Sequence, residues 1–157
     1  SNKITQIAQV ANVSVSKFKD AVNVFSQGAM QSAKISKYVE NKAIGIIGKI
    51  NRVTYLQTAY GNVINERGDD ENMQKQAQNL NAWYENAAVY FANSKSFEKA
   101  SIPAKQISDL VKANLEESKC GYHMNDIQKF VDRFTKVKQA SKEIFKIIDT
   151  TIEESVK

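Results

Sequence analysis

Apolar residues recur with one helical spacing along most of the first 66 residues. From Thr5 to about Glu66 there is no proline, and the steps between core positions alternate between four and three residues. This alternation is the heptad signature of a helix that lies along other helices. We therefore predict a long N-terminal helix over residues 1–66, which would measure about 90 Å at about 1.5 Å per residue. The a positions are Ala8, Val15, Val22, Ala29, Ser36, Ala43, Ile50, Gln57 and Ile64, and the d positions are Ile4, Ala11, Phe18, Phe25, Ser32, Val39, Ile46, Val53 and Tyr60.

The same helix has a broader apolar face in its second half. A broader face predicts contact with two helices rather than one. It also offers a surface for a partner helix, and Ile46, Ile47 and Ile50 are the candidate binding residues there. The apolar residues of this face are Val39, Ile46, Ile47, Ile50, Val53 and Leu56.

A polar corner follows the long helix. Gly68 fits the left-handed position just past a helix end, where glycine carries no steric penalty. Asp69 or Asp70 then caps the next helix, because a carboxylate there accepts backbone N–H groups and faces the positive end of the dipole.

Three further helices and one short helical turn complete the chain. Residues 71–92 carry a stripe of apolar side chains, and residues 97–100 add a turn. Pro103 lies in the first turn of a helix over 101–120, where its missing N–H costs nothing. The last helix covers residues 125–157, with Asn125 as its cap and Gln128 placed to complete a capping box.

These segments predict an all-α fold and a single helical domain over residues 1–157. Two long helices, from the two ends of the chain, form an elongated bundle. The helices of the middle region, 71–120, form a shorter pair or appendage between them.

Composition and charge narrow the function. Apolar residues make up 42% and charged residues 25%, which is ordinary for a globular domain. The net charge of +5 is uneven, because residues 1–64 hold eight Lys or Arg against two acids. These cations, Arg52 among them, are spread along the helix without a nucleic-acid-reading motif, which favours a solvated face over a phosphate-binding one.

The residues offer little for catalysis. His123 is the only histidine, so one chain has no histidine-based metal cluster, and there is no glycine-rich phosphate loop. Cys120 precedes His123 by three residues, and a thiol beside an imidazole can act as nucleophile and base. A helix-end cysteine beside a loop histidine explains the pair more simply. We expect no enzyme activity, no metal and no cofactor.

Arg67-Gly68-Asp69 is the short integrin-recognition tripeptide. It needs an exposed, tight turn that holds a guanidinium and a carboxylate at its two ends, and a corner between helices provides such a turn. The capping roles described above explain the same three residues, so both interpretations stay open.

The compartment is open from the sequence. No apolar run is long enough to span a membrane. A single cysteine excludes an intramolecular disulfide, and no signal peptide precedes Ser1. The protein is therefore expected outside the cytoplasm, in the periplasm or at the cell surface, if this is a mature form, and in the cytoplasm if the chain is complete.

The layout resembles the minor pilus-tip subunits of type IV secretion systems. The matching parts are residues 4–10, the segment 18–22 of the long helix, the middle region 68–121 and the helix from Asp126 onward. The resemblance implies an exported helical protein whose long N-terminal and C-terminal helices pack around a smaller appendage. Some members of this family are host-cell adhesins, which gives Arg67-Gly68-Asp69 a context.

Two functions follow from these observations. The first is a structural and adhesion subunit of a secretion pilus, which docks to other secretion-system subunits and contacts a recipient cell or host-cell receptor. The second is an intracellular helical binding module, a chaperone or adaptor, which holds a partner helix on the broad apolar face of residues 43–56. Self-association through that face belongs to the second hypothesis.

Overall fold

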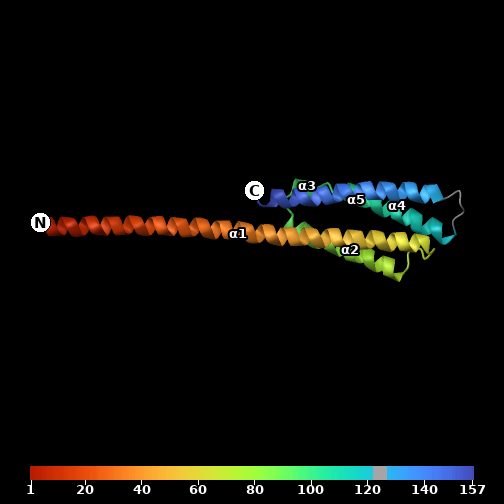
Figure 1. The fold of residues 1–157 in the computed structure, drawn as a ribbon, viewed down its shortest axis with the longest axis horizontal. Coiled ribbons are helices and arrows are strands. Elements are labelled where there is room, and N and C mark those ends of the chain that lie inside the picture. The colour runs from red at the N-terminus through yellow and green to blue at the C-terminus, as the bar shows by residue number, and fades with distance from the viewer. Residues whose placement is uncertain (122–126) are drawn as a thin grey trace. The chain divides into compact units, whose positions relative to one another are not determined.

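The computed structural model describes residues 1–121 and 127–157, and within them the chain forms helices and no strand (Figure 1). The all-α helical bundle predicted from the sequence is confirmed, with helix bounds within two residues of those expected. Asn125 and His123, the predicted cap and the candidate base, lie outside the described residues. The helices are α1 (Asn2–Ile64), α2 (Glu71–Tyr90), α3 (Lys95–Glu98), α4 (Ser101–Lys119) and α5 (Ile127–Ser155).

The chain divides into two units, Ser1–Val39 and Glu40–Lys157. The first unit is the N-terminal part of α1, which runs through Gly28 without a break. Its side chains are exposed except for Tyr38, which is half-buried. The second unit holds the rest of α1 together with helices α2 to α5, and it contains the hydrophobic core.

The core of the second unit takes one face from each of its four longer helices. The apolar stripes predicted for the middle and C-terminal segments supply most of it, and their burial confirms the periodicity of those helices. The core side chains include Tyr55, Leu56, Ala59 and Val63 of α1, Met73, Leu80, Trp83 and Ala87 of α2, Ile107, Val111 and Leu115 of α4, and Phe130, Val137, Ile144, Ile148 and Ile152 of α5.

The face that α1 buries is not the one its apolar pattern predicts. Ile46, Ile47 and Ile50 were expected to pack against two helices, and this expectation is wrong, because each is about half exposed. The buried side, called the inner face below, consists of glycine and polar residues up to Arg52 and is mainly apolar from Tyr55 onward. It consists of Asn41, Gly45, Gly48, Arg52, Tyr55, Leu56, Ala59, Asn62 and Val63.

Glycine explains why this side is buried. An ideal Cβ at Gly48 would lie 2.2 Å from the indole ring of Trp83, so the ring rests directly on the α1 backbone. The Trp83 indole N–H also donates to the carbonyl oxygen of Ile44 at 2.8 Å. A larger residue at position 48 would separate α1 from α2 and break this contact.

A second glycine on the inner face receives α5. A Cβ at Gly45 would lie 2.6 Å from Ile152 Cδ1 and 2.9 Å from Ile148 Cγ2. Asn41 Nδ2 donates to Ser155 Oγ at 2.8 Å nearby, and Lys49 forms an ion pair with Asp149. The α1–α5 contact therefore combines close backbone approach with polar contacts on its flanks.

Polar contacts also position α3 and α4 on α5. The Arg133 guanidinium of α5 binds the Glu117 carboxylate of α4 through two hydrogen bonds, 2.7 and 2.9 Å long. Glu154 accepts hydrogen bonds from the hydroxyls of Ser94 and Ser96, at the start of α3. These contacts fix the connection between α2 and α4, which carries one wall of the cavity described below.

The Gly48 contact yields a first prediction. Replacing Gly48 with alanine should lower the free energy of unfolding by about 1–3 kcal/mol or more, because the new methyl group overlaps the Trp83 ring. Gly61→Ala is the matched control in the same helix, where a Cβ meets no heavy atom within 4 Å. It should leave stability unchanged or raise it by about 0.5–1 kcal/mol. Urea unfolding followed by circular dichroism measures both, and equal effects of the two changes would contradict the Gly48 contact.

Candidate functional site

The corner that carries Arg67, Gly68 and Asp69 begins where α1 ends. The N–H of Arg67 donates to the carbonyl oxygen of Asn62 at 2.8 Å, and that of Glu66 to Val63 at 3.2 Å. This pair of bonds is the Schellman pattern, whose left-handed residue is Glu66 with φ 55°. Gly68 has the left-handed conformation that was predicted for it, but α1 ends at Ile64, and the left-handed residue that follows its end is Glu66 and not Gly68.

Gly68 has a different role in the corner. Its φ is 63°, and a Cβ there would lie 2.9 Å from Lys119 Cδ. The buried side chain of Asn62 donates to the Gly68 carbonyl oxygen and to Asp70 Oδ1, both at 2.9 Å. One amide group thus ties the loop to α1 and to the start of α2.

The two neighbouring aspartates have separate tasks. Asp70 caps α2, because its Oδ1 accepts the backbone N–H of Met73 at 2.9 Å. That hydrogen bond, followed by the one from Asn62 and the charge of Arg67, lowers the pKa of the Asp70 carboxyl. The Asp69 side chain is exposed and takes no part in the cap, although its backbone carbonyl oxygen accepts from Gln74 at 3.1 Å.

The corner has the accessibility that recognition by another protein requires. Arg67 and Asp69 are exposed on either side of the buried Gly68. Their backbone is held by the Asn62 amide and by the cap of α2, so the turn is pre-organised. The sequence predicted these three residues as a partner-binding set, and the structure leaves both charged groups free to meet a partner.

The second candidate surface runs along α1 opposite its inner face. In the second unit the heptad residues Ala43, Ile46, Ile50 and Val53 are exposed, with Ile47 beside them. We call the exposed apolar a and d residues of α1 from Ile4 to Val53 the outer seam. The seam is apolar, whereas the inner face beside it, from Asn41 to Arg52, consists of glycine and polar residues.

The outer seam has its other members in the first unit, described here by itself. Its exposed apolar side chains there are Ile4, Ala8, Ala11, Val15, Phe18, Val22, Phe25, Ala29 and Val39. The stretch is also poor in charge, because Lys17, Lys19 and Asp20 are the only charged residues from position 4 to position 33. A helix this apolar is typically covered by another helix.

The described residues do not assemble a metal or membrane site. No group of three or more histidine, cysteine or acidic side chains lies within metal-binding reach in residues 1–121 and 127–157. No helix among these residues is long and apolar enough to cross a membrane. Cys120 is exposed at the end of α4, and the structure does not describe its proposed partner His123.

Sequence reasoning missed the role of one cation. It grouped Arg52 with solvated lysines, but the Arg52 side chain is 3% exposed. The available signal was its register, because Asn41, Gly45, Gly48 and Arg52 follow each other at alternating steps of four and three. Residues with that spacing share one face of a helix. We did not predict that this face is buried, because its residues are glycine and polar residues.

Comparison of the chain with protein-family models, with curated proteins and with solved structures finds no match.

The Asp70 cap yields a prediction about acid stability. A carboxyl whose pKa is lowered by folding stabilises the fold above its unfolded pKa, about 3.9, and loses that contribution as the pH falls through the folded value. Asp70→Asn keeps a capping oxygen but removes the ionisable group. Its thermal midpoint should therefore stay near that of the parent protein at pH 3 and fall below it at pH 7, where the parent gains from the charged cap.

Differential scanning calorimetry between pH 3 and pH 7 measures this difference. Glu117 and Glu154 also have lowered carboxyl pKa values through hydrogen bonds from Arg133 and from Ser96, so part of the acid sensitivity remains in the variant. A variant with the same dependence on pH as the parent protein would exclude Asp70 as a contributor.

Proposed function

We propose that this chain is a non-enzymatic structural subunit of a type IV secretion pilus. In this role the outer seam of α1 docks to helices of other pilus subunits. The corner at residues 67–69 faces the recipient or host cell. The single observation that carries the proposal is an apolar seam of heptad spacing that the protein itself leaves uncovered.

The spacing of the seam identifies the kind of partner. Side chains at alternating steps of three and four residues insert between side chains of a neighbouring helix, knobs into holes. A flat surface or a strand has no such repeat. The occupant of the outer seam is therefore a helix, and a pilus built of helical subunits supplies one.

The size of the exposed side chains supports an obligate contact. Phe18 and Phe25 are 70% and 78% exposed. Burying an aromatic or aliphatic side chain of this size stabilises a contact by about 1.5–3 kcal/mol before the costs of association. Monomeric proteins rarely leave contiguous apolar surface of this extent in water.

The corner supports the adhesive part of the proposal. Its two charged side chains are exposed, and the backbone between them is held by Asn62 and by the Asp70 cap. A pre-organised turn loses less conformational freedom when it binds a receptor.

A second candidate function is an intracellular binding module, and the exposure of Ile46, Ile47 and Ile50 favours it. In that case the face holds a helix of a client protein or of a second copy of the chain. The cellular compartment of the native protein distinguishes the two functions. A protein outside the cytoplasm supports the pilus subunit, and a protein confined to the cytoplasm supports the module.

The seam makes a prediction that adjacent residues can test. Phe25→Lys places a charge on the outer seam, while Val24→Lys places the same charge beside it on an equally regular part of α1. Both side chains are exposed, at 78% and 69%, so neither change should disturb folding. Phe25→Lys should abolish co-isolation of the protein with pili sheared from the native cells, and Val24→Lys should reduce it far less.

Circular dichroism of the two variants controls for the integrity of the helix. Equal recovery of both variants with the pili would contradict docking through the outer seam. Absence of the parent protein from the pilus fraction would overturn the pilus assignment itself.

The corner makes a separate prediction about adhesion. Asp69→Glu lengthens the exposed carboxylate by one methylene and should abolish attachment of integrin-bearing cells to surfaces coated with the protein. Glu71→Asp, a change of the same size in the opposite direction at the start of α2, is the matched control and should leave attachment intact. Attachment that survives Asp69→Glu unchanged would remove the adhesive role of the corner.

A further inference from the structure

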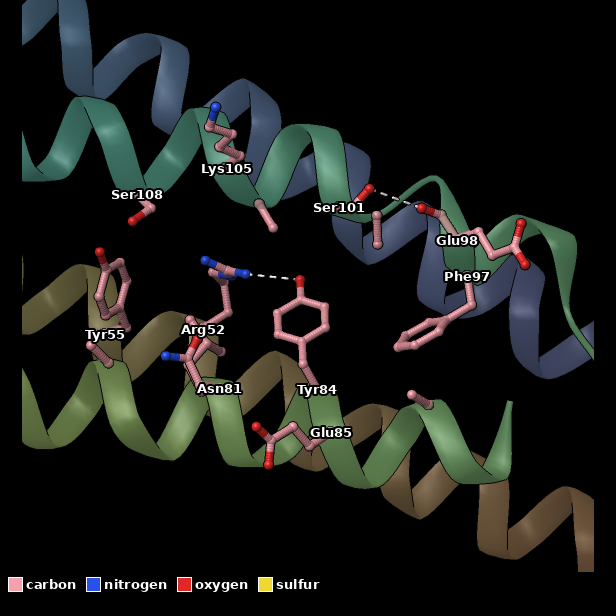
Figure 2. A pocket seen from close by; sticks show the side chains of 15 residues that line it. Arg52, Tyr55, Asn81, Tyr84, Glu85, Phe97, Glu98, Ser101, Lys105 and Ser108 are labelled. Atoms are coloured by element: carbon pink, nitrogen blue, oxygen red, sulfur yellow. Dashed lines mark hydrogen bonds between the residues drawn. The ribbon is translucent and has the colours of Figure 1, made fainter. Parts of the chain in front are cut away.

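The second unit contains a cavity of about 740 Å³ whose floor is α1 (Figure 2). Residues of α2 form one wall, and residues of α3 and α4 form the opposite wall. This volume lies within the range of about 300–1,000 Å³ that is typical of small-molecule sites. All of its lining residues belong to the unit Glu40–Lys157.

A buried arginine lines this cavity without a counter-ion. The Arg52 side chain is 3% exposed, and among the described residues no carboxylate forms an ion pair with it. Nη2 donates to the Tyr84 hydroxyl at 2.9 Å, whereas Nε is buried with no hydrogen-bond partner in the described chain. A guanidinium offers five N–H donors, so most of its capacity to bind an anion is unused.

The surroundings of Arg52 favour a negative charge beside it. The guanidinium carbon lies 5.9 Å from the ring centre of Tyr55 and 5.8 Å from that of Tyr84, which holds the group in place. The Tyr84 oxygen accepts from Arg52, so its own O–H is free to donate. Burial raises the pKa of the Tyr55 hydroxyl, which therefore also remains a donor at neutral pH. Figure 2 shows Asn81 of α2 and Ser108 of α4 pointing into the same gap.

The remaining walls select the body of the ligand. They are mainly apolar, and their side chains include Ala77, Leu80, Ala88, Phe97, Ala100 and Ala104. Two acids, Glu85 and Glu98, also line the cavity and disfavour a dianion such as phosphate. One guanidinium matches one carboxylate, since its N–H groups pair with the two oxygens in parallel.

We propose that the cavity between α2 and α4 binds a small organic monocarboxylate with an apolar body, whose carboxylate pairs with Arg52. The donors for the carboxylate are Arg52, Tyr84 and Tyr55, and the apolar body lies against Leu80 and Phe97. This site goes beyond the assembly role proposed above and does not depend on it.

The protein carries its own reporter for this site. Trp83 is the only tryptophan, and its ring centre lies 5.1 Å from that of Tyr84 and 6.2 Å from that of Phe97, both of which line the cavity. Ligand binding should therefore change the tryptophan fluorescence of the full chain. The probes are benzoate, octanoate and 4-phenylbutyrate, with 4-phenylbutan-1-ol as the uncharged match of the last.

At least one of these carboxylates should bind saturably, and 4-phenylbutyrate should bind at least about tenfold more tightly than the alcohol, because a charge-assisted pair is lost with the carboxylate. Arg52→Met keeps a long apolar side chain in place of the unpaired charge and should fold. In this variant the acid and the alcohol should bind with equal, weak affinity. Lys105→Met, which removes a cation from the rim of the same cavity, should preserve the preference for the acid.

A second variant keeps the test decisive if Arg52→Met does not fold. Ala104→Leu fills the cavity from α4 and should weaken binding of the acid and the alcohol alike, whereas Ala113→Leu, on α4 but outside the cavity, should not. Three results each overturn the proposal. They are no saturable binding of any of the three carboxylates up to about 10 mM, equal affinity of the parent protein for acid and alcohol, or loss of the preference in Lys105→Met.

Discussion

The close approach of two helices to the backbone of α1 is the contact on which the second unit depends. Gly45 admits Ile148 and Ile152 of α5, and Gly48 admits the Trp83 ring of α2. Two glycines one turn apart thus set the positions of both neighbouring helices. Because glycine weakens an isolated helix by about 0.5–1 kcal/mol each, the packing that it permits must exceed that loss. The apolar residues of the outer seam remain outside the core, because the glycines place the opposite side of α1 against its neighbours.

Polar groups then fix what the glycines bring together. Asn62 holds the corner after α1, the Arg133–Glu117 pair joins α4 to α5, and Glu154 holds the start of α3. The Asn62 bond satisfies a backbone carbonyl oxygen in the loop, and the other two contacts pair side chains of neighbouring helices. Arg52 differs from them, because its hydrogen bonds are incomplete in a buried place. An incompletely paired buried cation is costly for stability alone, and that cost is the physical reason to expect a ligand there.

Most of the fold follows from periodicity, and most of the candidate sites do not. The stripes of α2, α4 and α5 are apolar and buried, so their spacing predicted both the helices and the core. The inner face of α1 from Asn41 to Arg52 escaped prediction because it consists of glycine and polar residues, which a search for apolar periodicity does not count. The corner was predicted as a turn with a left-handed Gly68, and Gly68 does adopt that conformation, but the left-handed residue just past the end of α1 is Glu66, which a search for glycines does not find. The lack of an ion pair at Arg52 could not be predicted from the sequence, because it depends on how α1, α2 and α4 pack around this side chain.

The heptad spacing of the outer seam has a geometric consequence for whatever covers it. Seven residues of an ideal α-helix turn about 20° less than two full turns, so a strict heptad stripe drifts around a straight helix. From Ile4 to Phe25, three heptads within the first unit, the drift amounts to an arc of about 60°. A straight, rigid groove could not stay in contact with the stripe over its whole length. A partner helix that follows the stripe must coil around α1 with a left-handed twist. Assembly would therefore convert this stretch from a straight helix into one helix of a left-handed superhelix.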